Sequence, residues 1–468
     1  MSSVAMNRAE RLGWPSGEAG GAPRRAARLL WLLGACAVLL AWSVAPARAL
    51  TLKQCVELAL KNNPSLQAGR TGLKLAHSEL SEQRSRNFGR LEMVSSYTRY
   101  NLPRTLAPMT PAAIMGDPTS VATTENLFTA GLVYEVALFT GFAQTRSIEI
   151  AALQKEMGKV DLRLSREQLI YNVKTLYVKI LAQKAQEKAQ RAYLKALQRL
   201  HDDIAYQLKL GKKARVDLLK AAADLEKARA TLFKITAATK NLTAGLLALL
   251  DVGSLGELEE IDPTRRAMSA VQQDFTGRIP ELRRLKVAQM EVDKNKLQVE
   301  RANSEYFPQV VLSMGYGHNF GPNDSSNYHS GDWRDEEVWQ AGLMLKWNLF
   351  DFGVRSAKLK KARLRQRQSR YRRRQTELEL RRALEEAVTK INTAVAEFKS
   401  ARSELAMTKE TEAIEQVRFD KGAADINDLL YAKARNQMAL SRYINAGYNY
   451  MISRFYLDYL LERGEEKR

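Results

Sequence analysis

Apolar side chains recur every third or fourth residue along two long stretches of the chain. The spacing alternates between four and three residues in both, at Leu153, Met157, Val160 and Leu164 and again at Leu384, Val388, Ile391 and Val395. This pattern is typical of a helix that packs against other helices as in a coiled coil. No proline lies between Thr119 and Asp262 or after Asn323, and a proline inside a helix costs about 3 kcal/mol. The two stretches therefore predict long, uninterrupted helices.

A glycine divides each helical stretch in two. A helix from about Phe142 to Leu210 would extend for about 100 Å at about 1.5 Å per residue, and Gly211 then offers a turn. Beyond it the same spacing resumes at Leu218, Ala221, Leu225, Ala228, Leu232 and Ile235. We expect one antiparallel hairpin at about 142–250 and a second at about 353–462, which turns at Gly422. Taken alone, such hairpins are equally typical of a structural rod.

A period of two residues precedes each hairpin. Its apolar members are Trp339, Ala341, Leu343, Leu345, Trp347 and Leu349 in one strand, and Phe128, Ala130, Leu132, Tyr134, Val136 and Leu138 in another. Residues 310–316 predict a third strand and residues 91–97 a weaker fourth, which gives strand pairs at about 90–139 and 309–350. Alternating strands of about ten residues fit a membrane β-barrel. An ordinary half-buried sheet shows the same alternation.

Four strands are too few to close a barrel by themselves. The smallest outer-membrane barrels use about eight strands, and lipid does not tolerate open sheet edges. If the strands enter a membrane, several copies of the chain must share one barrel. The pattern then predicts an obligate oligomer.

The chain repeats itself at an offset of 211 residues. Ala130-Gly131-Leu132 recurs as Ala341-Gly342-Leu343, and Asp217-Leu218-Leu219 recurs as Asp428-Leu429-Leu430. A constant offset over about ninety residues predicts the duplication of one large unit. We expect structural repeats at 50–262 and 263–468, each with a strand pair followed by a helical hairpin. The fold class is therefore mixed α and β.

The first 49 residues read as a secretory signal peptide. Arg24, Arg25 and Arg28 precede an uncharged apolar run from Leu29 to Val44, and Ala47-Arg48-Ala49 supplies the small residues of a cleavage site. A membrane-anchoring helix and lipidation of Cys36 are the alternatives, and Met6 is an alternative start. Beyond residue 49 no apolar run reaches the length of a transmembrane helix. An exported chain of this kind would enter a membrane through strands or join it as a peripheral assembly.

Charge raises a competing interpretation. The 468 residues carry a formal net charge of +21. Removing residues 1–49 takes away six basic and two acidic residues, which leaves +17. The densest basic run, Lys358 to Arg374, resembles a nucleic-acid patch, but an exported protein meets no nucleic acid. We expect a solvated helix face that contacts anionic lipid or lines a tunnel, and no nucleic-acid partner.

Motifs for catalysis or cofactor binding do not stand out. Two cysteines exclude a cysteine zinc cluster, and the four histidines lie far apart in the sequence. No nucleophile elbow, phosphate loop or metal motif is recognisable. We therefore expect neither an enzyme nor a cofactor.

The ordered set of features resembles the TolC family of outer-membrane channel proteins. The resemblance spans Leu50 to about Leu461. Its carriers are the start from Leu50-Thr51-Leu52 to Asn62-Asn63-Pro64, the strand pairs, the hairpins, and the Gly-x5-Asp-Leu-Leu motif at Gly211 and Gly422. The resemblance implies a homotrimer with a twelve-stranded transmembrane β-barrel and an α-barrel tunnel that crosses the periplasm. It also implies a periplasmic adaptor and an inner-membrane transporter of the RND, ABC or MFS type as partners.

The function implied is a passive exit duct for efflux or type I secretion, located in the outer membrane. A non-conducting coiled-coil protein of the envelope is the alternative. In this family the tunnel closes at the hairpin tips, which assigns the periplasmic gate to Asp217 and Asp428; each is alternatively a helix-start residue favoured by the dipole. Two positions depart from the family pattern, Tyr431 where a second aspartate is expected and Ala424 where an arginine is expected.

Two further sets of residues follow from the resemblance and the strand pattern. The tip and adaptor contacts are Gly211, Gly422, Lys212, Arg215, Asp425, Tyr206 and Phe419. The lipid-facing barrel positions are Trp339, Leu343, Leu345, Trp347, Leu132 and Tyr134. The aspartate and the arginine that the family pattern expects are absent here. Links between the hairpin tips can come instead from Lys212, Lys213, Arg215 and Asp425. For Tyr206 and Phe419, packing within the hairpin is the alternative to partner contact.

Overall fold

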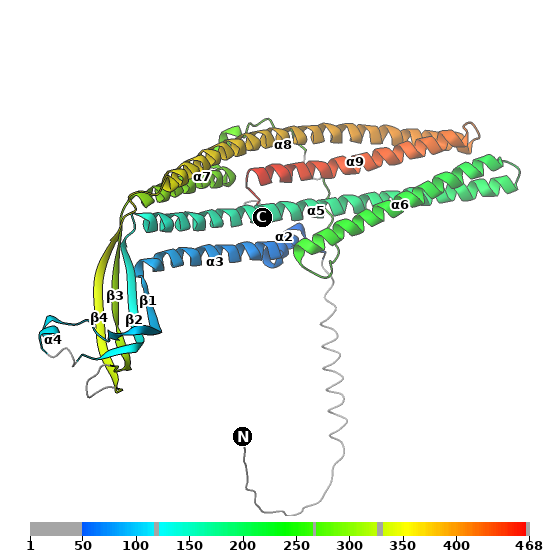
Figure 1. Ribbon diagram of the computed structural model, residues 1–468. Helices are drawn as coiled ribbons and strands as arrows, with labels where there is room; N and C mark the ends of the chain where they lie inside the picture. The colour runs from blue at the N-terminus through cyan, green and yellow to red at the C-terminus, as the bar shows by residue number, and fades with distance from the viewer. Residues whose placement is uncertain (1–48, 117–120, 265–267, 325–330, 465–468) are drawn as a thin grey trace, which may run out of the picture. The chain divides into compact units, whose positions relative to one another are not determined.

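The computed structural model describes residues 49–116, 121–264, 268–324 and 331–464. The expected signal peptide, apart from Ala49, lies outside the described residues. Residues 49–50 and 256–259 belong to a small unit of their own, in which Leu50 and Leu258 form an isolated parallel bridge. Everything described below belongs to the second unit, which holds the remaining described residues (Figure 1).

Four strands form one antiparallel sheet in the order β1-β2-β3-β4. They are β1 (Arg90–Thr105), β2 (Thr123–Phe139), β3 (Gln309–Pro322) and β4 (Trp333–Lys346). The short helix α4 (Pro111–Met115) lies in the connection between β1 and β2. The period-two pattern thus predicted all four strands. It placed the end of the fourth strand wrongly, because Trp347 and Leu349 continue the alternation after β4 has ended at Lys346.

Two helical hairpins follow the strand pairs. The first consists of α5 (Ala143–Lys209) and α6 (Arg215–Leu250), and the second of α8 (Val354–Asp420) and α9 (Ile426–Leu460). Both turns use a glycine with a left-handed backbone, Gly211 at φ 71° and Gly422 at φ 75°, a conformation that glycine adopts without steric cost. The predicted ranges of 142–250 and 353–462 agree with these bounds to within two residues.

Three further helices were not predicted from the spacing. They are α2 (Leu52–Asn62), α3 (Pro64–Ser85) and α7 (Arg283–Asn303); the short 3₁₀ segments are η1 (Arg86–Phe88), η3 (Thr276–Glu281) and η4 (Ser304–Tyr306). Local signals were present, because Thr51 and Gln54 form a capping box and Asn63 caps α3 just before Pro64. These capping signals are local and lie outside the long periodic runs that predicted the hairpins.

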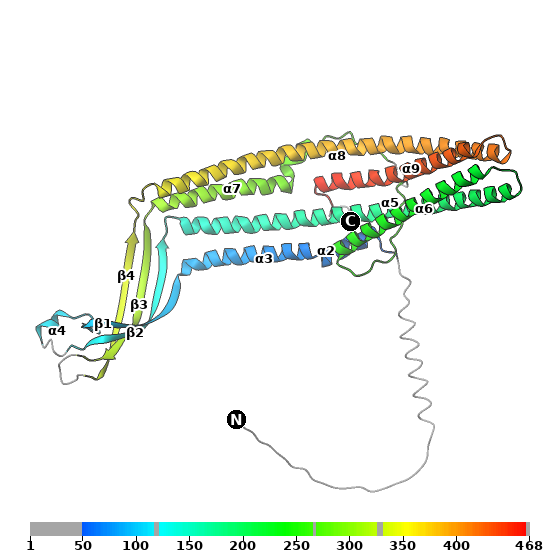
Figure 2. The same ribbon diagram turned by 45° about the vertical axis from the view of Figure 1, so that its right-hand side comes forward.

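Four helices lie side by side where they meet the sheet. α3 packs on α5, α5 on α7, and α7 on α8, as both views show (Figures 1 and 2). A cluster of buried side chains from α7, α8, α9 and the segment before α7 forms one core, around Leu285, Leu384, Ile391 and Leu460. A second core joins the two hairpins near their tips. None of the described helices has a segment long and apolar enough to cross a membrane.

The two hairpins match in backbone detail at the offset of 211 residues. At the tips, Gly211 N donates to Leu208 O and Gly422 N to Phe419 O, both at 3.0 Å. At the helix starts, Ala143 N donates to Thr140 O and Val354 N to Asp351 O, both at 3.2 Å. α5 and α8 each contain 67 residues. The same local hydrogen bonds therefore begin and end the long helix of each hairpin.

Candidate functional site: the sheet, the junction and the hairpin tips

The sheet has one apolar face. Residues directly opposite one another on neighbouring strands share a face, and the registers place Met93, Leu132, Tyr316 and Trp339 in one row across all four strands. The adjacent row consists of Leu91, Tyr134, Met314 and Ala341, and the next includes Val136, Leu312 and Leu343. Trp339, Leu343 and Leu345 are 65–70% exposed. A single chain thus leaves a broad apolar surface without cover.

The opposite face carries polar and small residues. Arg90 forms an ion pair with Glu135 at 2.7 Å across β1 and β2, and Glu135 is opposite Ser313 in β3. Gly131 is directly opposite Gly317. A Cβ atom at Gly317 would lie 2.5 Å from Ala130 O and 2.7 Å from Gly131 Cα, so β2 and β3 approach too closely for a side chain there.

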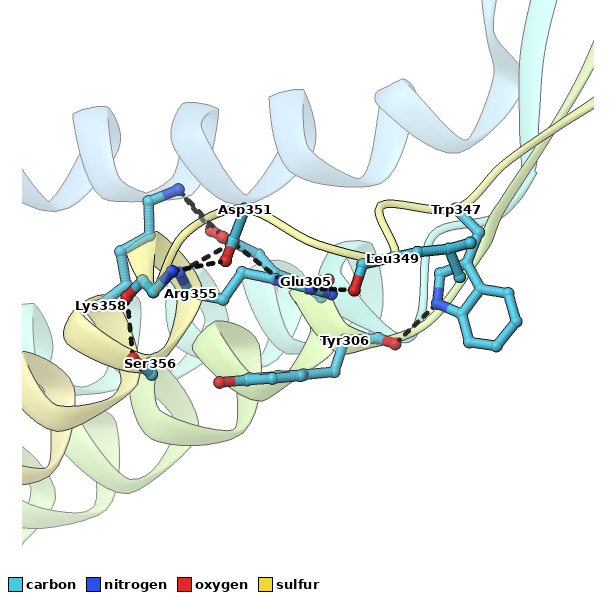
Figure 3. Close-up of polar contacts among 9 residues, drawn as sticks. Glu305, Tyr306, Trp347, Leu349, Asp351, Arg355, Ser356 and Lys358 are labelled. Carbon is cyan, nitrogen blue, oxygen red and sulfur yellow. Dashed lines mark hydrogen bonds and ion pairs between the residues drawn. The ribbon is translucent and has the colours of Figure 1, made fainter.

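Five of the six expected lipid-facing residues lie on the apolar face of the sheet. They are Leu132, Tyr134, Trp339, Leu343 and Leu345. Trp347 follows β4, and its Nε1 donates to Tyr306 O at 3.1 Å (Figure 3). That hydrogen bond ties the chain after β4 to η4, the short 3₁₀ segment that follows α7.

Aromatic rings gather at both ends of the apolar face. The ring of Phe128 lies 4.7 Å from Tyr97, 5.6 Å from Phe320 and 5.5 Å from Trp333, at the end of the sheet farther from the helices. At the end nearer the helices, Phe139 contacts Phe142 at 5.3 Å and Phe142 contacts Phe307 at 6.3 Å. Two aromatic belts with apolar rows between them are typical of strands that cross an outer membrane.

A polar network fixes the passage from β4 into α8. Arg355 Nε donates to Asp351 Oδ2 at 2.9 Å and Arg355 Nη2 to Leu349 O at 3.1 Å (Figure 3). Its guanidinium also lies 4.9 Å from the centroid of the Tyr306 ring, and Lys358 pairs with Glu305 at 2.9 Å. Burial alone would raise the pKa of Asp351, but its hydrogen bonds from Arg355 and Gly353 lower it. The carboxylate therefore stays ionised and holds the first turn of α8.

The expected gate residues begin the return helices. Asp217 and Asp428 lie in the first turns of α6 and α9, and Asp428 is exposed. Neither forms an ion pair with any described residue. Asp428 lines a cavity of about 300 Å³ together with Tyr431, Arg435 and Arg418. Tyr431, which replaces an expected aspartate, is 66% exposed and lies 5.7 Å from the Arg435 guanidinium.

Most of the other tip residues are exposed, whereas Asp425 forms a hydrogen bond within the tip. Lys212, Arg215, Gly211 and Gly422 are exposed, and Tyr206 is 65% exposed. Asp425 caps α9 by accepting a hydrogen bond from Asn427 N; this bond, with a contribution from Lys220, lowers the pKa of Asp425.

Phe419 does not offer a free surface. It is 7% exposed and belongs to the core that joins the hairpins, with Leu197, Leu200, Ile204, Ile426 and Leu429. Lys213 Nζ lies 4.1 Å from the centroid of its ring. This burial favours packing over partner contact for Phe419, although the packing joins two hairpins and is not confined to one. Spacing within one hairpin could not reveal a core shared between two.

One ion pair near the tips was missed by sequence reasoning. Lys433, 9% exposed, lies on α9, and its Nζ lies 3.1 Å from Glu412 Oε1 on α8. Asn436 also donates to Glu412. Burial, together with Asp224 and Glu412, raises the pKa of nearby Tyr193 to about 12. Among the described residues no group of three or more acidic, histidine or cysteine side chains could hold a metal ion.

Long helical hairpins joined to a four-stranded sheet with an apolar face define the class of outer-membrane channel subunits. Residues 55–251 and 281–461 match the family described as outer membrane efflux protein. The chain belongs to this family, which contains the TolC-like channels. The chain is accordingly a channel protein of the bacterial outer membrane and not an enzyme.

Solved structures of channels have the same fold. CusC, described in connection with folding and transmembrane channel formation, is 17% identical, with a TM-score of 0.74 over 88% of this chain and 91% of that chain. VceC from Vibrio cholerae is 16% identical, with a TM-score of 0.72 over 88% and 96%. The CmeC outer membrane channel of Campylobacter jejuni is 17% identical, with a TM-score of 0.72 over 88% and 86%. No curated protein sequence matches significantly.

Proposed function

We propose that the protein is the exit duct of a tripartite efflux or type I secretion system. Three copies would close a twelve-stranded barrel in the outer membrane, and their helical hairpins would form a tunnel through the periplasm. Substrates would pass without energy input from the duct itself. An inner-membrane transporter and a periplasmic adaptor would work at the tunnel's far end.

The observation that carries this proposal is the unfinished sheet. Among the described residues, β1 pairs only with β2 and β4 only with β3, so each outer strand has an unpaired row of backbone groups. An unpaired backbone group in lipid costs several kcal/mol, and the apolar face needs a lipid environment. Pairing of β4 with β1 of the next copy would satisfy both requirements.

The helices next to the sheet support the same closure. α8 packs on α7 on one side, and its other side carries Leu364, Tyr371 and Leu378, spaced by seven residues and 49–70% exposed. Such a stripe is typical of a helix seam. α3 lies at the other end of the row of four helices, and it would receive α8 of the next copy.

The tips are the proposed gate and adaptor site. Asp217 and Asp428 would each form a ring of three carboxylates around the tunnel axis, and such rings favour cations. Tyr206, Lys212, Arg215 and the tip glycines remain the proposed adaptor contacts because they are exposed. Asp425 keeps a supporting role there as the cap of α9.

We also propose that residues 50–262 and 263–468 are copies of one ancestral unit. The equal lengths of α5 and α8 and their matching terminal hydrogen bonds support this division. A duplicated unit gives each copy of the chain two similar sectors of the tunnel wall.

The proposal is tested by purifying the full chain from outer membranes and recording single channels in planar bilayers. We expect a trimer that dissociates only on heating and discrete conductance steps. A trimer that never conducts would support the alternative, a non-conducting coiled-coil protein of the envelope.

Replacing the gate carboxylate tests the tip assignment. Asp428→Ala is expected to raise the leak conductance of the closed channel and to weaken block by cations, because three like charges leave the constriction. Asp420→Ala is the matched control, since it removes one carboxylate per copy from the same tip outside the return helix. Equal effects of both variants, or unchanged cation block in Asp428→Ala, would refute the gate role.

A further inference from the structure

A cavity lies where the sheet meets the helices, on the side of the apolar face. Its volume is about 460 Å³, and its lining includes Phe142, Arg146, Glu300, Phe307, Leu359 and Arg363. These residues come from α5 and the residue before it, from α7 and α8, and from the segment before β3. The proposed duct function assigns this cavity no role.

The wall of the cavity nearer the sheet continues the apolar surface. Phe139 is opposite Val310, which is opposite Leu345 in β4, so Phe139 belongs to the apolar face. Its ring contacts Phe142, and Phe142 contacts Phe307. The cavity therefore opens directly below the apolar rows.

The backbone holds one of these rings in an unusual conformation. Phe142 has φ 69°, a region that residues other than glycine rarely adopt, yet its side chain remains 56% exposed. Gly141 beside it also has a positive φ, and a Cβ there would lie 2.5 Å from Ser304 O. The tight approach of α5 to the end of α7 forces this turn, and the turn presents the ring at the surface.

The wall farther from the sheet is cationic. Arg146 is occupied by Glu149 at 2.6 Å and Glu300 at 3.0 Å, whereas Arg363 is exposed and forms no ion pair with any described residue. Lys360, Arg363, Arg367 and Arg370 are spaced by three, four and three residues, so they form one stripe along α8. A separate stripe of the same helix carries Lys358, Lys361, Arg365 and Arg372.

We propose that this cavity binds the phosphate of an anionic phospholipid in the periplasmic leaflet of the outer membrane, with Arg363 as its principal cation. Aromatic rings beside acyl chains and basic side chains at the phosphates match the order of layers in a leaflet. A soluble anion would need the arginine but not the exposed rings of Phe142 and Phe307. The inference rests on the proposed lipid contact of the apolar face.

The test uses the full-length protein in detergent, titrated with phosphatidylglycerol and followed by native mass spectrometry. Arg363→Gln is expected to lower the affinity for phosphatidylglycerol about fivefold, the effect of one basic residue at an anionic membrane surface. Arg365→Gln, which removes the same charge from the other stripe of α8, is the matched control and should leave the affinity unchanged. Equal losses in both variants, or no loss in either, would overturn the proposal.

A second variant separates lipid binding from packing. Phe142→Gly removes the ring, and glycine accepts positive φ without strain, so thermal stability should not fall while phosphatidylglycerol binding weakens. A large loss of stability with unchanged binding would contradict the assignment. Free glycerophosphoglycerol should compete poorly; competition as strong as that of the lipid would identify a soluble anion instead.

Conductance separates this proposal from the duct function. Arg363→Gln should conduct like the unmodified protein, because the cavity lies on the side of the apolar face. If the unmodified protein conducts normally but does not bind phosphatidylglycerol specifically, only the lipid site is rejected. A failure of the unmodified protein to conduct would reject the duct proposal.

Discussion

Asn63 illustrates how one side chain can join two helices. Its Oδ1 accepts a hydrogen bond from Leu66 N at 3.2 Å, which caps α3, while its Nδ2 donates to Leu249 O at 3.0 Å near the end of α6. The residue is 6% exposed. It therefore satisfies one orphan donor and one orphan acceptor of two helix ends.

Asn63→Ala is expected to lower the free energy of unfolding by about 2–3 kcal/mol. An N-cap is worth about 1 kcal/mol, and a buried polar group left without a partner costs about 1–3 kcal/mol. Urea denaturation followed by circular dichroism measures the change. Asn62→Ala is the control, because Asn62 donates a single hydrogen bond to Leu250 O at 3.3 Å; a loss as large as that of Asn63→Ala would show that the cap contributes little.

Gly131 and Gly317, which lie opposite each other on β2 and β3, set how closely these two strands approach. Gly317→Ala would place a methyl group against the backbone of Ala130 and Gly131, and overpacking of this kind costs about 1–3 kcal/mol. We expect a lower midpoint of thermal unfolding and less protein in outer-membrane fractions. Gly315→Ala is the control on the same strand and face, since its Cβ would lie 3.5 Å from the Gln340 side chain and 4.0 Å from Leu132 O, both ordinary contact distances. Indistinguishable variants would refute the close-approach argument.

The elements also show how far the sequence could be followed. Long periodic runs predicted α5, α6, α8 and α9 because the apolar stripe of a packed helix repeats every three or four residues and is visible in the sequence. α7 was missed because it is short and rich in charge. Its start is held by a distant group, the Glu462 carboxylate, which accepts hydrogen bonds from Arg283 N and Arg284 N at 2.7 and 3.1 Å. Such a cap leaves no trace in the local sequence.

Some features of the candidate site could likewise be predicted from local sequence, and others could not. The alternation of side chains placed Trp339, Leu343 and Leu345 on one face, since strand period is a local property. The burial of Phe419 and the Lys433–Glu412 pair depend on contacts between helices distant in sequence. The cavity beside Phe142 needs three helices and a strand junction to be in place. Local sequence patterns therefore predicted the helices and strands. The buried Phe419, the ion pair and the cavity depend on packing between these elements and could not be predicted from them.

For the whole molecule, the open edge of β4 provides the sharpest test of assembly. Along an antiparallel strand, successive N–H groups point alternately toward one neighbour and the other. Of the adjacent residues Ala341 and Gly342, one therefore donates toward β3 and the other toward the open edge. Proline is tolerated at an edge where its missing N–H would face solvent, and it is disruptive where that N–H is paired.

If β4 pairs with β1 of the next copy, both Ala341→Pro and Gly342→Pro should abolish the trimer that resists dissociation without heating. Each removes one ladder hydrogen bond in a lipid environment, where an unsatisfied backbone group costs several kcal/mol. If the edge is free, one of the two prolines should be tolerated. Electrophoresis of unheated and heated outer-membrane protein measures how much of each variant migrates as a trimer. Ala341→Ser is the control for a change of side chain alone. Because the two variants differ by a single position, only pairing on both sides of β4 predicts that both fail.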